Sequence, residues 1–169
     1  SEAKVLFSTK SNLYLAQRII KKSNLNIELI EIDKNNFTDS LEDVKKKETN
    51  ELNSSDNALL MYTSGTTGKP KGVMLTHDNI LNGGKNVSLS HNLNKLDKVL
   101  CVLPLYHING LIVTVMGPLV SNSSLVLCEK FSATNFWHEI SEFKCTWFSI
   151  VPTIVSSLIN KYSENEFKL

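Results

Sequence analysis

The sequence predicts an α/β fold with a mainly parallel sheet and helices on both faces of that sheet. Short apolar stretches alternate along the chain with amphipathic, helix-like stretches, which is the pattern of parallel strands joined by helices. The chain has 169 residues, enough to bury a core, and 41% of them are hydrophobic against 21% charged. The length therefore fits a single α/β domain over residues 1–169.

The first part of the chain is expected to hold a strand at residues 4–7, a helix at 12–22 and a strand at 27–32. Acidic and basic side chains then dominate a polar excursion at residues 33–57, which is typical of a surface segment. One short helix is expected within it, around residues 40–47.

The alternation resumes with a strand at residues 58–62, followed by a loop and a helix that begins near Thr76, a good N-cap residue. Gly83 and Gly84 inside this helix mark either a close helix crossing or an early helix end. Later strands are expected at 99–103, 124–128 and 146–151, and later helices at 109–120, 133–143 and 153–161. All four strands from residue 58 onward are expected in one mainly parallel sheet with right-handed crossovers.

The loop before that helix, residues 62–72, has the composition of a phosphate-binding loop. No Asp or Glu occurs from residue 57 to 77, and the loop combines hydroxyl side chains, glycines and two lysines. Pro70 directly follows Lys69, where a Walker loop has Ser or Thr, and the glycine spacing differs from that of a dinucleotide fingerprint. A solvated linker is the alternative, but the apolar stretches on both sides favour a polyanion site.

Composition excludes several classes of partner. The formal net charge of +1 gives no overall attraction to nucleic acid or to a membrane surface. The longest apolar stretch, residues 111–120, is too short to span a bilayer, and no secretory signal is recognisable. Three cysteines without C-x-x-C spacing indicate reduced core thiols and a cytoplasmic setting: Cys101, Cys128 and Cys145.

Three segments resemble the adenylate-forming (AMP-binding) superfamily, and within it the acyl-CoA synthetases, including fatty-acyl-type and oxalyl-type CoA ligases. They are "LLMYTSGTTGKPKGVMLTH" at 59–77, "LPLYHINGL" at 103–111 and "KFSATNFWHEISEFKCTWFSIVPTIV" at 130–155. The resemblance covers the chain from about residue 57 onward. It implies part of the large N-terminal domain of such an enzyme.

Enzymes of this family use ATP to convert a carboxylic acid to an acyl-adenylate and then transfer the acyl group to coenzyme A. The resemblance therefore implies ATP, Mg²⁺ and coenzyme A as cofactors of the complete protein, and a small carboxylic acid as its substrate. It implies a set of residues around the β- and γ-phosphates of ATP: Thr63, Ser64, Gly65, Thr66, Thr67, Gly68 and Lys71, with Lys69 in the same loop. Lys71 is also expected to assist catalysis, because its charge would follow the leaving pyrophosphate.

His107 matches the family position near the carboxylate that is activated, and Tyr106 would line the same region. Without the resemblance, a structural histidine is an equally good interpretation. Asn109 stands in the part of the motif where amino-acid-activating relatives carry an Asp for the substrate amine, which favours an ordinary carboxylic acid. The other histidines are expected at the surface or in caps: His77, His91 and His138.

Several motifs of the family are absent from these 169 residues, including those that serve adenine, magnesium and ribose, and the C-terminal lysine. We therefore expect no metal ligand here, and we expect the chain alone to be inactive as a fragment of a larger enzyme. Two alternatives stay open: a non-catalytic phosphate-binding or scaffold module derived from the family, and a P-loop nucleotidase. Pro70 argues against the nucleotidase.

Overall fold

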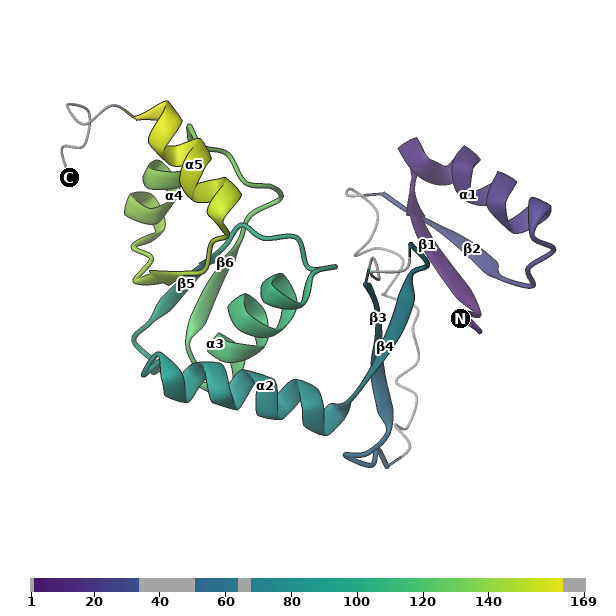
Figure 1. Cartoon of the computed structure of the whole chain (residues 1–169), viewed down its shortest axis with the longest axis horizontal. Helices are drawn as coiled ribbons and strands as arrows, with labels where there is room; N and C mark the ends of the chain where they lie inside the picture. Colours follow the sequence, from purple (N-terminus) through teal and green to yellow (C-terminus); the bar gives the residue numbers. More distant parts are fainter. Residues whose placement is uncertain (1, 34–50, 64–67, 163–169) are drawn as a thin grey trace. The chain divides into compact units, whose positions relative to one another are not determined.

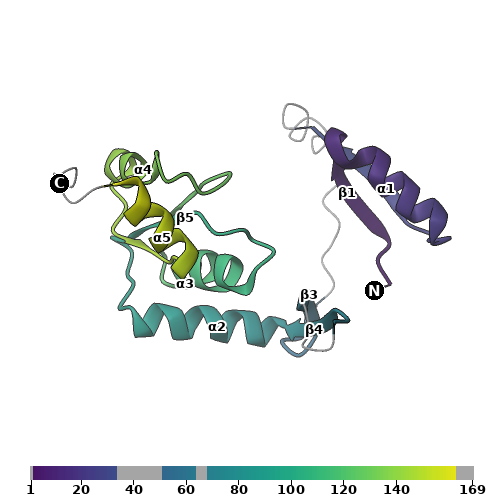
Figure 2. The ribbon, with the colours of Figure 1, turned by 45° about the horizontal axis from the view of Figure 1, so that its top comes forward.

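The computed structural model describes residues 2–33, 51–63 and 68–162. The chain divides into two compact units, residues 1–50 and 51–169, and Figures 1 and 2 follow the chain through both from purple to yellow. The single partial domain expected from the sequence stays a prediction.

The first unit is a small parallel β-α-β motif. Strand β1 (Val5–Thr9) pairs in parallel with β2 (Glu28–Ile32), and helix α1 (Lys10–Lys22) joins them. The helix carries two lysines in its last turn, where positive charge complements the negative end of the helix dipole. These elements confirm the strand, helix and strand that the sequence predicts for this part of the chain. The short helix expected at 40–47 lies outside the described residues.

The second unit begins with a β-hairpin, which corrects the predicted topology. Strand β3 (Asn57–Thr63) pairs antiparallel with β4 (Lys71–Thr76), and the two form a sheet of their own. The prediction that the strand at 58–62 lies in the parallel sheet of the later strands is therefore wrong. An antiparallel strand pair needs only a short connection, whereas a parallel pair needs a long crossover. The apolar residues after Gly72 form a strand only a few positions after β3, so the antiparallel pairing results.

The later strands form the parallel sheet that the sequence predicts. Strands β5 (Lys98–Cys101), β6 (Ser124–Leu127) and β7 (Trp147–Phe148) lie in the order β6-β5-β7, and both pairings are parallel. Residues Val99, Leu100 and Cys101 of the central strand are completely buried. Such full burial is expected for a central strand with helices on both faces.

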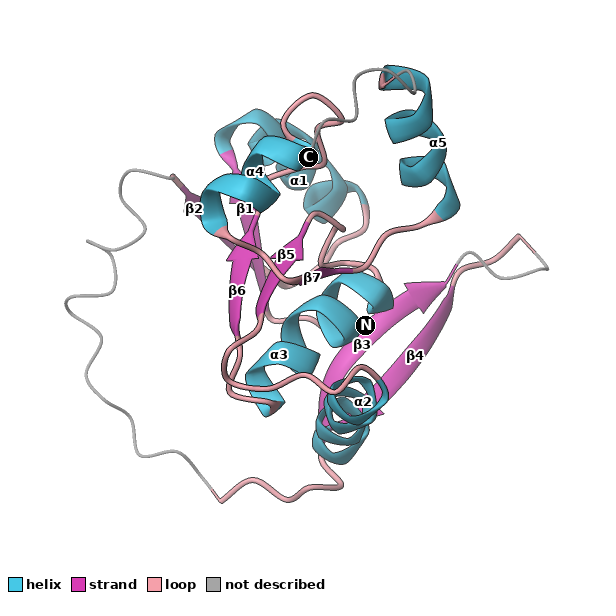
Figure 3. Ribbon diagram, turned by 90° about the vertical axis from the view of Figure 1, so that its left-hand side faces the viewer, coloured by secondary structure: helices cyan, strands magenta, loops and turns pink. Residues whose placement is uncertain are grey.

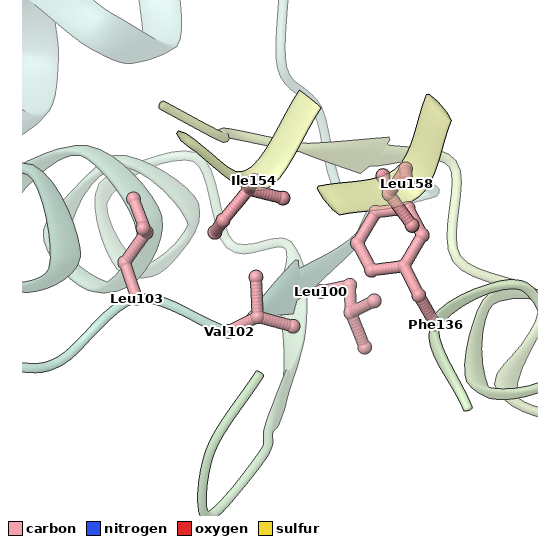
Figure 4. Packing of buried hydrophobic residues seen from close by; sticks show 6 residues of the cluster. All are labelled: Leu100, Val102, Leu103, Phe136, Ile154 and Leu158. Carbon is pink, nitrogen blue, oxygen red and sulfur yellow. The ribbon is translucent and has the colours of Figure 1, made fainter. Parts of the chain in front are cut away.

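Helices cover both faces of this sheet, as predicted. The core cluster in Figure 4 joins Leu100 of β5 to Phe136 of α4 (Phe136–Phe143) and to Ile154 and Leu158 of α5 (Pro152–Lys161). The next strand residue, Cys101, instead lies 2.9 Å from the hydroxyl of Thr114 in η2. Successive strand residues point to opposite faces, so η2 lies across the sheet from α4 and α5. Figure 3 shows α3, which directly follows η2, on the side of the sheet away from α4 and α5.

The helix expected at 109–120 is divided in two. Its first part, η2 (Asn109–Met116), is π-helical, and its second part, α3 (Gly117–Val120), is α-helical. Pro118 has no N–H to donate to the carbonyl of Thr114, and this interrupts regular α-helical bonding between the two parts.

Helix α2 (His77–Ser90) begins at Thr76 as predicted and packs closely on η2 and α3. The Thr76 side chain accepts a hydrogen bond from the Asn79 N–H, and the Asn79 side chain accepts one from the Thr76 N–H, which completes a capping box. A Cβ atom on Gly84 would lie 2.9 Å from the Met116 carbonyl oxygen. Because α2 continues to Ser90, the glycines mark a close crossing and not an early helix end.

Candidate functional site

The β3–β4 hairpin brings the two ends of the candidate phosphate loop together. Thr63, the last residue of β3, is the cross-strand partner of Lys71, the first residue of β4. Ser64, Gly65, Thr66 and Thr67 lie outside the described residues. The hairpin thus places one expected hydroxyl and one expected cation opposite each other at the mouth of the loop.

The described part of the loop has the features of an anion site. Gly68 has a positive φ of 77°, and a Cβ atom there would meet nothing within 4 Å. Lys69 and Lys71 are exposed, and no carboxylate occurs in the sequence between residues 57 and 77. A left-handed glycine and exposed lysine side chains are groups that proteins use to bind anions, so the phosphate-binding role of this loop stays a prediction.

The opposite end of the hairpin is fixed to the start of α2. The His77 N–H donates to the Asp56 carbonyl at 3.1 Å, and the Asp78 N–H donates to the Ser54 carbonyl at 2.9 Å. Within the hairpin, Gly72 lies so close to Leu60 that an added Cβ would come within 3.1 Å of its side chain. The hairpin is therefore anchored to the start of α2 at the end opposite the loop.

The second candidate region is the loop at residues 104–108, at the carboxyl end of β5. The His107 N–H donates to the Pro104 carbonyl at 3.1 Å, and the His107 carbonyl accepts from the Leu111 N–H at 3.1 Å. The rings of Tyr106 and His107 lie against each other with centroids 4.6 Å apart, and both side chains are exposed. Ligands of open α/β sheets bind at the carboxyl ends of the strands, where this imidazole stands.

One further pair of side chains meets at this edge of the sheet. The Ser149 hydroxyl, just after β7, donates to the side-chain oxygen of Asn109 at 3.0 Å. Forty positions separate the two residues in the sequence, and no motif spacing connects them. Sequence reasoning used Asn109 only to argue against an amino acid substrate and missed this contact. Within the part of the chain that the structure describes, no hydrogen bond or ion pair joins this region to Lys71.

The remaining histidines lie apart from both candidate regions in their contacts. His77 begins α2, and His91 follows its last turn and packs on Trp147 with ring centroids 5.1 Å apart. His138 pairs with Glu142 at 3.3 Å on α4. These placements agree with the expected surface and capping roles.

The three cysteines are free thiols that pack in or beside the core. Burial, together with a smaller contribution from the nearby Glu139 carboxylate, raises the pKa of Cys128 to about 11. Burial also raises the pKa of Cys145. Thiols that hold their protons in this way are poor nucleophiles.

The described residues contain no cluster of metal ligands and no helix suited to crossing a membrane. No group of three or more His, Cys, Asp or Glu side chains within residues 2–33, 51–63 and 68–162 is placed to hold a metal ion. None of the helices in these ranges combines the length and apolarity that crossing a bilayer requires.

The fold is that of the N-terminal domain of adenylate-forming enzymes. The inhibitor-bound N-terminal domain of FACL13 from Mycobacterium tuberculosis superposes with a TM-score of 0.80 at 26% identity, over 94% of this chain and 40% of that one. O-succinylbenzoate coenzyme A synthetase (MenE) from Bacillus subtilis, solved in complex with ATP and a magnesium ion, gives a TM-score of 0.73 at 28% identity. That comparison covers 94% of this chain and 31% of the synthetase.

The sequence profile described as AMP-binding enzyme matches residues 1–168, so the chain belongs to the AMP-binding enzyme family. Among curated proteins, the sulfoacetate–CoA ligase of Cupriavidus necator is 55% identical over 103 residues. The match covers 61% of this chain and 20% of that ligase, so the chain spans about a fifth of the length of this relative.

Proposed function

We propose that residues 1–169 are part of an acyl-CoA synthetase that activates a carboxylic acid with ATP to an acyl-adenylate and transfers the acyl group to coenzyme A. The observation that carries the proposal is the β3–β4 hairpin: Thr63 pairs with Lys71, Gly68 has left-handed backbone, and the sequence holds no Asp or Glu from residue 57 to 77. The ligase names of the related proteins support the same reaction class.

The loop would bind the β- and γ-phosphates through backbone N–H groups, hydroxyls and lysine side chains. Thr63 and Gly68 supply donors from the described residues, and Ser64, Gly65, Thr66 and Thr67 supply the rest of the donor set. Lys69 and Lys71 supply positive charge. Lys71 is the first residue of β4 and so belongs to the hairpin itself, whereas Lys69 precedes it. ATP, when bound, would supply the adenylyl group that activates the acid: the carboxylate oxygen bonds to the α-phosphorus and pyrophosphate leaves. The role of these residues is to hold the leaving pyrophosphate and stabilise its growing charge.

His107 would orient the substrate carboxylate. Its imidazole is exposed at the carboxyl end of β5 and packs against Tyr106, so one ring nitrogen can donate to a carboxylate oxygen. Asn109 in place of an acidic residue supports an ordinary carboxylic acid over an amino acid. The name of the 55% identical relative supports a short acid that carries a second anionic group.

The complete protein would also use Mg²⁺ and coenzyme A, and residues outside this chain would hold most of both. The chain by itself is proposed to be inactive, since it spans about a fifth of its curated relative. The three free thiols favour a cytoplasmic setting.

A pyrophosphate titration of the isotope-labelled 169-residue chain, followed by backbone amide shifts, tests this function. We expect the amides between Thr63 and Gly72 to move, with weaker binding at higher salt because exposed charges are screened. Lys71→Ala should weaken binding about fivefold, the effect of roughly 1 kcal/mol from one charge near a phosphate in water. Lys85→Ala, an exposed lysine on α2, is the matched control and should bind as the parent does.

Absence of any shift in the loop at saturating pyrophosphate would contradict the phosphate-binding role. So would equal weakening by Lys71→Ala and Lys85→Ala, because the effect would then come from net charge alone. Exchange of labelled pyrophosphate into ATP by the purified chain would contradict the proposal that it is inactive alone.

A further inference from the structure

We infer that Asn109 and Ser149 are a positioning pair that holds the His107 loop in place at the carboxyl edge of the parallel sheet. The pair joins the segments that follow the adjacent strands β5 and β7 through one hydrogen bond, from the Ser149 hydroxyl to the Asn109 side-chain oxygen, at 3.0 Å. The inference deepens the proposed function, on which the role of His107 rests.

The loop at residues 104–108 has few packing contacts of its own. Tyr106 is 74% exposed and Ile108 is 50% exposed, and His107 is exposed as well. Apolar contacts therefore do little to fix the loop, and segments of this kind open at low free energy. Its place has to be set by the two ends of the loop.

The loop begins just after β5, and the close approach of Gly110 to Pro104 closes its base. A Cβ atom at Gly110 would overlap the Pro104 carbonyl, so the chain turns tightly on itself at the base of the loop. The His107 N–H and the Leu111 N–H each add one backbone hydrogen bond inside this turn. These contacts are local and move together with the loop.

Asn109 supplies the side-chain contact from the loop to another strand. It is the first residue of η2, two positions after His107, and it is half-buried. Its partner Ser149 is one position beyond the β7 residue Phe148, which pairs with Leu100 of β5. The bond therefore ties the loop to a strand whose other end is already fixed, because the Thr146 N–H donates to the Lys98 carbonyl at 2.8 Å.

The geometry also explains why an asparagine and a serine suit these places. A carboxamide oxygen can accept from the serine hydroxyl without bringing a charge beside His107 or beside an anionic substrate. Catalytic geometry is sensitive to displacements of about 1 Å. A hydrogen bond made two residues from His107 can therefore limit the displacement of its imidazole. The pair acts through His107 and needs no contact with the substrate.

Ser149→Ala in the 169-residue chain tests the inference, with nuclear magnetic resonance as the readout. We expect the His107 and Leu111 amides to exchange with solvent about fivefold faster, the change that the loss of one neutral hydrogen bond gives. The Hε1 signal of His107 should move toward its value in an unstructured peptide, since the neighbouring Tyr106 ring would no longer hold one orientation. Ser149→Thr keeps the hydroxyl and should restore both readouts.

The matched control is Ser156→Ala. This serine donates to the Pro152 carbonyl within α5 at 3.1 Å and joins no second element, so the His107 signals should stay as in the parent chain. Unchanged His107 signals in Ser149→Ala, or equal changes in Ser156→Ala, would overturn the inference. The pyrophosphate titration reports on the β3–β4 loop, so a failure of the proposed function can be told apart from a failure here.

A loss of fold in Ser149→Ala would be checked with Asn109→Ala, which removes the same bond from its other end. If Asn109→Ala folds, its His107 exchange and Hε1 signal decide the inference by the same criteria. If both variants lose the amide dispersion of the parent, the bond supports the whole domain and the inference is overturned.

Discussion

Replacement of Gly84 by alanine tests the helix crossing that supports the parallel sheet. Gly84 is buried where α2 crosses η2 and α3. An added Cβ would lie 2.9 Å from the Met116 carbonyl oxygen, 3.0 Å from the Met116 carbonyl carbon and 3.1 Å from a Val120 methyl group. Two of these three atoms belong to the backbone and cannot rotate away.

Two opposing effects set the expected magnitude. Alanine is favoured over glycine inside a helix by about 1 kcal/mol. Overpacking against a fixed neighbour costs roughly 1–3 kcal/mol, and the backbone obstacle at Met116 places this site at the upper end. We therefore expect Gly84→Ala to lower the free energy of unfolding by about 2 kcal/mol. The midpoint of thermal unfolding should fall by roughly 6 °C for a chain of this size.

Circular dichroism during heating measures this change, and two other variants make the comparison specific. Asn86→Ala is exposed on α2 and should leave the midpoint unchanged or slightly higher. Gly117→Ala should also lower the midpoint, because its Cβ would lie 2.8 Å from a Val87 methyl group. This obstacle is a side chain, so the double change Gly117→Ala with Val87→Ala should recover part of that loss. A Gly84→Ala chain that melts at or above the parent would refute the close crossing.

Three other variants or conditions have defined outcomes. Thr114→Val removes a fully buried hydroxyl that donates to the Gly110 carbonyl at 2.6 Å, and urea unfolding should show a loss of about 1–3 kcal/mol; a loss below about 0.5 kcal/mol would contradict this. Because burial raises the pKa of Cys128 from 9.0 to about 11, its stabilising contribution is complete below pH 9 and is lost between pH 9 and 11. The melting midpoint of the parent chain should fall as the pH rises from 9 to 11, and the midpoint of the Cys128→Ala chain should fall less. Equal falls of the two midpoints would contradict the prediction, because groups other than Cys128 would then cause them. Gly68→Ala places an alanine at a φ of 77° in open space, so it should lower stability by about 1 kcal/mol, while Gly68→Asn should cost less; equal stability of all three chains would contradict the left-handed backbone.

The sequence by itself determined the features that depend on neighbouring residues. Alternating apolar and amphipathic stretches gave the α/β class, the three parallel strands and most helices. The Thr76 cap was also predictable, because a capping residue acts on backbone groups within three positions. The phosphate-binding role of the loop at 62–72 rests on its glycine, hydroxyl and lysine groups and on the family resemblance, and it stays a prediction.

Only the tertiary structure decided which strands pair and which distant side chains meet. The antiparallel pairing of β3 with β4 was missed because an apolar stretch has the same appearance with either kind of neighbour. The two roles left open for Gly84 were separated only by the position of Met116 across the crossing. The contact between Asn109 and Ser149 spans forty positions, and it exists because parallel pairing brings the carboxyl ends of β5 and β7 to one edge of the sheet. Sequence spacing carries no record of such a contact, since it depends on strand register and not on local preference.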